Sequence, residues 1–273
     1  MDKGIVYIAF GTYYVSMCYA SVISLRNYSK LPVLIISNED LHPKFQDIAN
    51  IYFNKVTEID DARLIKTNLL NYTLFNKTIF LDCDTLVFTD ISFLFNQLNF
   101  FDLVIKQRTS SYNKNSHKGQ LLIEENAKVK DLSHWNSGVF CFVKNENIEL
   151  FFSKWLDKFK EYSYSFDQPS LVYSIYNTDI KIGSLEDKWN YQNALSIYNK
   201  NKDYIIHYSS STNVLIRKYI LKNCSSLERK IIIKKFFENY KKRINKIGKF
   251  RFIKYILKDY LQFIVCKIRC SSY

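Results

Sequence analysis

Residues 78–84 read Thr78-Ile79-Phe80-Leu81-Asp82-Cys83-Asp84, an apolar run that ends in two carboxylates two positions apart. The run predicts a buried strand. Side chains at i and i+2 of an extended chain share a face, so Asp82 and Asp84 can approach one divalent cation. Ligands of open α/β sheets bind beyond the carboxyl ends of the strands, where this pair would lie. The alternative is a solvated turn. Apolar residues also follow the pair, and burying unpaired carboxylates there would cost on the order of several kcal/mol.

Composition limits the class of protein. The chain has 273 residues and is 47% hydrophobic, which is enough for one large α/β domain with an appendage. It has only 6 Gly and 3 Pro, and neither a P-loop nor a Gly-x-Gly-x-x-Gly fingerprint is present. The six cysteines show no Cys-x-x-Cys spacing, which predicts reduced thiols and a cytoplasmic location.

The first 36 residues predict a β-α-β unit. Residues 4–25 carry no charge, so a signal peptide or a membrane span has to be considered. Polar residues within the stretch and the lack of a basic leader favour a strand over 5–10, a turn at Gly11 and a helix to Leu25 instead. A buried strand over 32–36 follows. The other expected helices cover 61–75 and 149–162, and Asp60 or Asp61 would lie near the N-cap of the first. Further strands are expected over 103–106, 139–143 and 205–208. Alternating strands and helices predict a mixed, mostly parallel sheet flanked by helices.

Three further clusters accompany the Asp pair. They are a polar turn that enters a strand, a pair that starts a helix, and a lone His that ends an apolar strand: Trp135-Asn136-Ser137-Gly138-Val139-Phe140, Asp167-Gln168 and Ile205-Ile206-His207. In their order along the chain, these clusters form a recognisable pattern.

With these motifs the chain resembles the glycosyltransferases of the GT-A fold, and within them family 8, the glycogenin and lipopolysaccharide galactosyltransferase group. The resemblance covers roughly residues 4–210. Members show a basic residue on a helix, Asp-x-Asp-Thr-Leu-Val followed by Leu-Phe, Asn-Ser/Ala-Gly-Val, and Asp-Gln. The matching residues here are Lys66, Asp82 to Val87, Leu94-Phe95, Asn136 to Val139, and Asp167-Gln168. The resemblance implies a Rossmann-like GT-A catalytic domain over residues 1–216.

The resemblance also implies a metal site. Asp84 would be the main carboxylate ligand, Asp82 would share the metal and the donor ribose or sugar, and His207 would be the third protein ligand. Hard oxygen ligands suit Mn²⁺ or Mg²⁺, and a His favours Mn²⁺. The alternative for His207 is a hydrogen-bonded core histidine.

A nucleotide-diphosphate sugar is the donor that the resemblance implies. Arg63 and Lys66, three positions apart on a helix, would clamp its nucleotide and sugar, although a solvated basic face is the alternative. Tyr14 would stack on the base or serve a structural role. Asp167 and Gln168 would lie near the anomeric carbon as the catalytic pair. The other implied donor-binding residues are Ala9, Phe10 and Gly11 at the base, Cys83 between the two acids, and Asn136, Ser137 and Gly138 around the sugar.

One segment departs from the family pattern. Family members follow their His with a Gly and then Lys-Pro-Trp, whose Lys contacts the diphosphate. Here the sequence after His207 is Tyr208-Ser209-Ser210-Ser211-Thr212-Asn213. Hydroxyls of this run, or Arg217 or Lys218, could meet the diphosphate instead.

The positive charge of the chain lies in its last part. Residues 217–273 contain 17 of the 39 Lys and Arg and 3 of the 26 Asp and Glu, so this part carries +14 and residues 1–216 carry −1. Basic and apolar positions interleave at helical spacing over 229–265, which predicts a basic amphipathic helical tail on an anionic membrane surface. Packing against the catalytic domain and nucleic-acid binding are the alternatives, and nucleic acid is the least expected partner.

The expected function is metal-dependent transfer of a hexose from a nucleotide-diphosphate sugar, a UDP-sugar in particular. The acceptor would be a glycan or lipid-linked saccharide, such as a bacterial surface saccharide or lipopolysaccharide, at the cytoplasmic face of a membrane. Family 8 resemblance implies retention of anomeric configuration. The alternatives are a catalytically silent, membrane-associated sugar-nucleotide-binding or lectin-like module and a sugar-phosphate nucleotidyltransferase. The nucleotidyltransferase should have a glycine-rich N-terminal loop, but this N-terminus has only Gly4 and Gly11.

Overall fold

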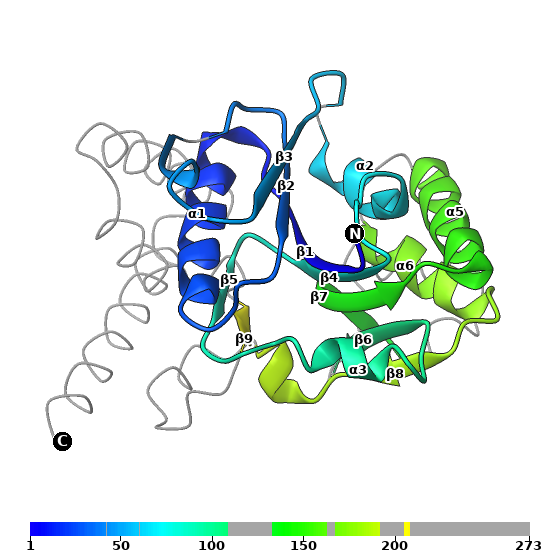
Figure 1. Ribbon diagram of the computed structural model, residues 1–273. Helices are drawn as coiled ribbons and strands as arrows, with labels where there is room; N and C mark the ends of the chain where they lie inside the picture. Colours follow the sequence, from blue (N-terminus) through cyan, green and yellow to red (C-terminus); the bar gives the residue numbers. More distant parts are fainter. Residues whose placement is uncertain (42, 60, 109–132, 163–166, 192–204, 208–273) are drawn as a thin grey trace, which may run out of the picture.

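A seven-stranded sheet runs through the centre of the computed structural model (Figure 1), which describes residues 1–41, 43–59, 61–108, 133–162, 167–191 and 205–207. The strands are β1 (Lys3–Ile8), β2 (Val33–Ser37), β3 (Ile51–Lys55), β4 (Lys77–Leu81), β5 (Thr85–Val87), β6 (Leu103–Gln107), β7 (Trp135–Val143), β8 (Ile182–Ser184) and β9 (Ile205–His207). The helices are α1 (Gly11–Arg26), α2 (Ala62–Thr67), α3 (Leu94–Gln97), α5 (Glu146–Glu161) and α6 (Asp167–Tyr176).

The sheet has the order β3-β2-β1-β4-β7-β6-β8. The pairs β1–β2, β1–β4, β2–β3 and β6–β8 are parallel, whereas β7 runs antiparallel to both β4 and β6. The predicted mixed, mostly parallel sheet is therefore confirmed. Because β7 is reversed, its first residues lie at the same edge of the sheet as the last residues of β1 and β4.

Alternate residues of β1 face two different hydrophobic layers, as strand geometry requires. Ile5 and Tyr7 pack in the layer that contains α1, α3, β5 and β9. Val6 and Ile8 pack in the layer that contains α2, α5 and α6, and this layer is rich in aromatic rings. Figure 1 shows α1 on one side of the sheet and α2, α5 and α6 on the other. Each face of the sheet is thus covered by helices.

The uncharged stretch near the N-terminus forms β1 and α1, as predicted. Helix α1 begins at Gly11, whose φ of 78° lies in the region that favours glycine. The Gly11 N–H donates to Asn38 Oδ1 at 2.8 Å, so the first turn of α1 is tied to the end of β2. Among the described helices, none combines the length and apolar character needed to cross a membrane.

Several element predictions were wrong in their bounds. The helix predicted over 61–75 is only α2, with Asp61 as its N-cap, followed by a one-turn 3₁₀ helix at Leu69–Asn71. Asn136 to Gly138, predicted as a turn, lie inside β7. The strand predicted over 205–208 is β9, which pairs with β5 in a separate two-stranded sheet. Strands β3 and β8 were not predicted, because β3 is a half-exposed edge strand and β8 has three residues around Gly183.

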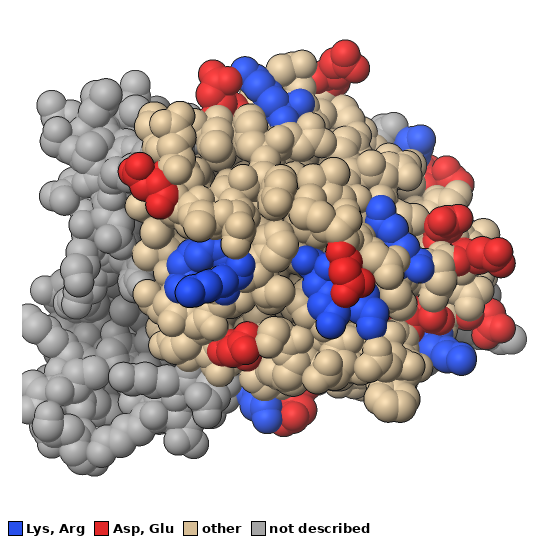
Figure 2. Space-filling view, viewed as in Figure 1, with Lys and Arg blue, Asp and Glu red and all other residues tan. Residues whose placement is uncertain are grey.

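Some predictions concern residues outside the described ranges. These are the boundary at residue 216, the basic tail over 217–273 and the segment that follows His207. On the face that Figure 2 shows, Lys and Arg side chains of the described residues are interspersed with Asp and Glu. This mixture agrees with the nearly neutral charge of residues 1–216.

The start of α5 supplies a stability prediction away from the site. The Asn145 side chain caps α5 by accepting the Ile148 N–H at 2.9 Å, and its Nδ2 donates to Asp102 Oδ1 at 2.7 Å. We expect Asn145→Ala to lower the free energy of unfolding by about 1–2 kcal/mol, because both bonds are lost. Urea unfolding measures the change, and Asn96→Ala at an exposed position of α3 is the control. An unfolding free energy equal to that of the control would contradict the capping role.

Candidate active site

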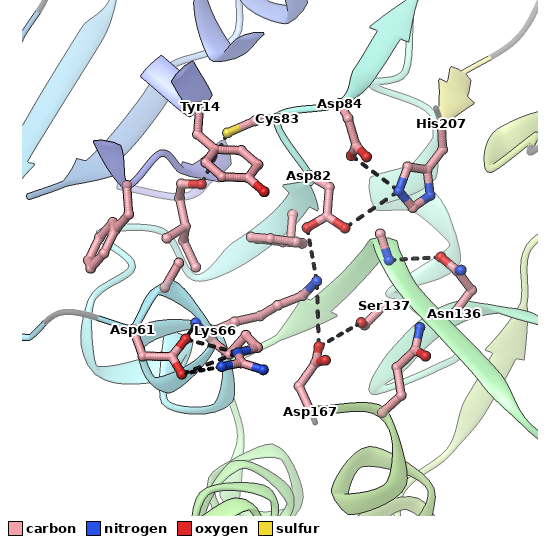
Figure 3. Close-up of a pocket in the computed structure, with 17 residues that line it drawn as sticks. Tyr14, Asp61, Lys66, Asp82, Cys83, Asp84, Asn136, Ser137, Asp167 and His207 are labelled. Atoms are coloured by element: carbon pink, nitrogen blue, oxygen red, sulfur yellow. Dashed lines mark hydrogen bonds and ion pairs between the residues drawn. The ribbon is translucent and has the colours of Figure 1, made fainter. Parts of the chain in front are cut away.

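A cavity of about 510 Å³ opens at the carboxyl ends of β1 and β4, next to the first residues of β7. This is the edge of the sheet where open α/β folds bind ligands, and the volume suits a small-molecule substrate. Figure 3 shows the side chains that converge on it. They come from β1 and α1, α2, the β4–β5 turn, β7, α6 and β9: Ile8, Phe10, Tyr14, Asp61, Ala62, Arg63, Lys66, Phe80, Asp82, Cys83, Asp84, Asn136, Ser137, Gly138, Asp167, Gln168 and His207.

The two acids lie in the turn between β4 and β5, not in an extended strand. Strand β4 ends at Leu81, and Thr85 N–H and Oγ1 both donate to the Asp82 carbonyl, at 3.2 and 2.8 Å. The Asp82 N–H donates to Gly138 O at 2.8 Å, which joins the turn to β7. The prediction that Asp82 and Asp84 share one face of an extended strand is therefore wrong. The turn nevertheless presents both carboxylates to the cavity.

Cys83, between the two acids, anchors this turn to the sheet. Its side chain is 5% exposed, and the thiol donates to the Ile8 carbonyl at 3.0 Å. Burial raises the pKa of the Cys83 thiol well above its ordinary value. Cys83 thus remains a neutral thiol at the floor of the cavity, and Asp82 and Asp84 on either side of it point away from the core.

His207 faces both acids from β9. The register that pairs Thr85 with His207 brings the last residue of β9 beside the start of β5. His207 Nε2 lies 3.2 Å from Asp84 Oδ1 and 3.6 Å from Asp82 Oδ2. Burial would lower the pKa of His207, but the Asp84 and Asp82 carboxylates raise it above its ordinary value. The three side chains form one cluster, although His207 is far from the two acids in the sequence.

The cluster fits a divalent cation. One ligand atom from each of Asp82, Asp84 and His207 lies within 4.8 Å of the other two. Burial raises the pKa of Asp82 above its ordinary value, and repulsion from Asp84 adds to this although Lys66 and His207 oppose it, so a further cation would stabilise the ionised Asp82 carboxylate. Two carboxylate oxygens and one imidazole nitrogen are ligands that suit Mn²⁺ and related divalent metals.

Lys66 supplies the positive charge in the middle of the cavity. Its Nζ lies 2.9 Å from Asp82 Oδ1, 3.9 Å from Asp167 Oδ2 and 4.7 Å from the centre of the Phe80 ring. Burial would lower the pKa of Lys66, but Asp82 and Asp167 raise it. Lys66 therefore keeps its charge between the two acids, which does not fit the alternative of a solvated basic face.

Asp167 is held by contacts to both its backbone and its side chain. At the start of α6, its carbonyl accepts Trp155 Nε1–H and Ser170 Oγ–H, each at 2.8 Å. Its carboxylate Oδ2 accepts the Ser137 hydroxyl at 3.2 Å. These contacts leave a carboxylate that points from α6 toward Lys66, as Figure 3 shows.

Arg63 lies at the wall of the cavity and is paired with Asp61. Its Nη2 is 2.7 Å from Asp61 Oδ2, and its Nε is 3.0 Å from Asp61 Oδ1. Lys66, the other residue of the predicted clamp, contacts Asp82 of the three-residue cluster. Tyr14, on α1, is 51% exposed and also lines the cavity, so its ring is accessible to a ligand.

The structure gathers most of the predicted site residues in this cavity, with two exceptions. Ala9 is fully buried among core residues of the α1 layer, and Gly11 starts α1, so neither lines the cavity. Sequence reasoning also missed Asn190, which contacts His207, and the role of Asp61 as partner of Arg63. Asn190 follows a 3₁₀ helix at Asp187–Trp189, where no periodic pattern or motif marks it.

The fold is similar to those of solved glycosyltransferases. Galactosyltransferase LgtC, in complex with donor and acceptor sugar analogs, has a TM-score of 0.52 and 14% identity, over 78% of this chain and 88% of that one. The glycosyltransferase GlyE of Streptococcus pneumoniae has a TM-score of 0.56 and 15% identity, over 88% of this chain and 64% of that one. Mouse xyloside xylosyltransferase 1 has a TM-score of 0.57 and 14% identity, over 78% of this chain and 99% of that one. No protein-family model and no curated protein matches the sequence. At these identities the likeness shows the fold, which is the GT-A fold that the motifs predict.

Proposed function

We propose that this chain, which has the fold of the GT-A glycosyltransferases, transfers a hexose from a nucleotide-diphosphate sugar to a saccharide or glycolipid acceptor in a metal-dependent reaction. One observation carries the proposal. The cluster of Asp82, Asp84 and His207 lies in the same cavity as the Lys66–Asp167 pair. A cation site beside a buried ammonium group suits a diphosphate, and a carboxylate nearby suits the sugar that it carries.

In the proposed reaction, the bond between the anomeric carbon and the diphosphate oxygen breaks and its electron pair leaves with the nucleoside diphosphate. The acceptor hydroxyl oxygen forms the new bond to that carbon and loses its proton. A divalent metal held by Asp82, Asp84 and His207 would stabilise the charge that develops on the diphosphate. Lys66 adds a fixed positive charge at the same place, and Asp167 presents a carboxylate where the sugar would lie.

The residues of the site also bear on which metal, which nucleotide base and which stereochemistry we propose. The imidazole ligand favours Mn²⁺ over Mg²⁺, because Mg²⁺ prefers oxygen ligands alone. The exposed ring of Tyr14 offers a stacking surface for a base, for which we propose uracil. Retention of anomeric configuration is proposed from the family 8 motifs, and NMR of the product anomer measures it.

Metal removal tests the proposed function. We expect metal-stripped protein to release nucleoside diphosphate from its donor about a hundredfold more slowly than protein supplied with Mn²⁺, because the leaving group loses its counter-charge. The assay screens UDP-, GDP- and ADP-sugars with simple saccharide acceptors, with and without Mn²⁺ and a chelator.

The same screen, extended by nucleoside triphosphates with a sugar phosphate and by a donor-binding measurement, separates the alternatives. A nucleotidyltransferase would release pyrophosphate from a nucleoside triphosphate and a sugar phosphate, and a silent module would bind donor without releasing product. Release that continues at full rate in chelator would show that the proposed mechanism is wrong.

A further inference from the structure

Asn190 contacts the side of the His207 ring that faces away from the acids. His207 Nδ1 lies 2.9 Å from Asn190 Oδ1, whereas His207 Nε2 faces Asp84 and Asp82. Asn190 is 0% exposed and His207 is 7% exposed, so the contact is made without competition from solvent. The two ring nitrogens therefore meet different partners, and this difference can set the position of the ring proton.

A backbone N–H determines how the two buried amides are oriented. The Gly138 N–H can only donate, and it lies 2.9 Å from Asn136 Oδ1. A carbonyl oxygen accepts two hydrogen bonds, and the second comes from Asn190 Nδ2 at 2.9 Å. Asn190 therefore uses its NH₂ group toward Asn136, which leaves its Oδ1 as the acceptor toward His207.

The proton on His207 follows from this orientation. Because Asn190 Oδ1 can only accept, His207 Nδ1 carries the hydrogen and donates it. In the neutral ring, Nε2 then holds the lone pair, and Nε2 is the atom that points at Asp84 and Asp82. Metal-ligating histidines commonly donate their other ring N–H to a fixed oxygen, which sets the tautomer and the ring angle.

The backbone of Asn190 is fixed independently of this network. Lys106, a buried residue of β6, donates from Nζ to the Asn190 carbonyl at 2.9 Å and pairs with Asp187 Oδ1 at 3.0 Å. On the next residue, Tyr191, the carbonyl accepts the His207 N–H at 2.9 Å. The position of Asn190 is thus set by β6 and β9.

We propose that Asn190 is a positioning residue that, together with Asn136, holds His207 in the tautomer and orientation that bind a divalent cation. The inference rests on the proposed function, since it assumes that His207 is a metal ligand. It adds a residue outside the cavity lining to the machinery of the site.

Mn²⁺ titration followed by electron paramagnetic resonance tests this role without any transfer assay. We expect Asn190→Ala to bind Mn²⁺ about tenfold more weakly than the wild type, because the ring loses its acceptor. We expect Asn190→Asp to recover only part of this loss, because one carboxylate oxygen still accepts the Nδ1 hydrogen but the other cannot donate to Asn136 Oδ1. Asn145→Ala is the control for general destabilisation, because it loses two side-chain hydrogen bonds beyond the opposite end of β7.

The ring proton itself is the second readout. The chain has four histidines, so ¹⁵N NMR of the imidazoles gives few signals, and His207→Ala assigns the relevant one. With Zn²⁺ as a diamagnetic probe, we expect Nδ1 to carry the proton in the wild type and Asn190→Asp but not uniformly in Asn190→Ala.

The possible outcomes separate the inference from the function on which it rests. Wild-type protein that binds no Mn²⁺ would overturn both the metal site and the role of Asn190. Wild-type protein that binds Mn²⁺ with the same affinity as Asn190→Ala would overturn the role of Asn190 alone. Equal weakening in Asn190→Ala and in Asn145→Ala would show that lost stability, not ring position, is the cause.

Discussion

Asp84→Asn is expected to lower kcat/KM for nucleoside diphosphate release by about a thousandfold, because the cation loses a charged ligand where the leaving group develops charge. Asp84 Oδ1 is the carboxylate atom closest to His207 Nε2, at 3.2 Å. An amide at this position keeps the size of the side chain but removes its negative charge. The metal site would retain Asp82 and His207 alone.

The same substitution is not expected to unfold the protein. Repulsion from Asp84 is one of the causes that raise the pKa of Asp82, so removal of the Asp84 charge relieves a repulsion in the folded state. The same change also removes an attraction to His207 and Lys66, so we expect the free energy of unfolding of metal-free Asp84→Asn to stay within about 1 kcal/mol of that of the wild type. The activity loss would then be chemical in origin and would not reflect a smaller folded fraction.

Steady-state kinetics measures the first effect and urea unfolding the second, and Asp90→Asn is the matched control. Asp90 is exposed and lies outside the cavity, so the same change of atoms there should leave kcat/KM within about twofold and the free energy of unfolding within about 0.5 kcal/mol of wild type. If Asp84→Asn retained wild-type kcat/KM, the assignment of this cluster to catalysis would be wrong.

Gly138→Ala is expected to abolish the three-ligand site by moving the His207 ring. A Cβ at Gly138 would lie 2.0 Å from His207 Cε1 and 2.3 Å from Nδ1, well inside van der Waals contact. Neither side can yield easily, because Gly138 O is bonded to Asp82 N–H in the sheet and the ring is buried. We expect Mn²⁺ affinity to fall about a hundredfold and the free energy of unfolding to fall by about 1–3 kcal/mol.

Gly183→Ala in β8 is the matched control for this substitution. Its Cβ would meet the Phe101 ring at 2.7 Å, but that side chain is 36% exposed and can move toward solvent. Mn²⁺ titration and urea unfolding of both variants give the comparison. Wild-type Mn²⁺ affinity in Gly138→Ala would mean that the His207 ring is not held against β7.

The sequence was informative where a motif coincided with a strand end. Asp82 and Asp84 could be predicted as a pair because they interrupt an apolar run, and His207 because it ends another. The reason for their proximity could not be predicted, since a turn and not a strand presents the acids. The pairing of β9 with β5 depends on a tertiary contact that no local pattern records.

The supporting residues were harder to find than the ligands. Asn190 has no periodicity, no charge and no neighbouring motif, and only its three-dimensional contacts with His207 and Asn136 reveal it. Ala9 and Gly11 were predicted to contact the donor because they follow a strand that ends near the site. In the fold the Ala9 side chain packs into the core and Gly11 starts a helix, so neither lines the cavity, and their contact with the donor stays a prediction.

The pairing of β5 with β9 also determines the order in which the protein can become functional during synthesis. Thr85 and His207 are partners in this ladder although β6, β7, α5 and α6 lie between them in the sequence. A nascent chain that has emerged only as far as Gln168 holds both acids and Lys66 but no imidazole ligand. Binding of the proposed cation by all three ligands would thus wait until the last described strand has left the ribosome and formed this long-range contact, which is a slow type of folding step.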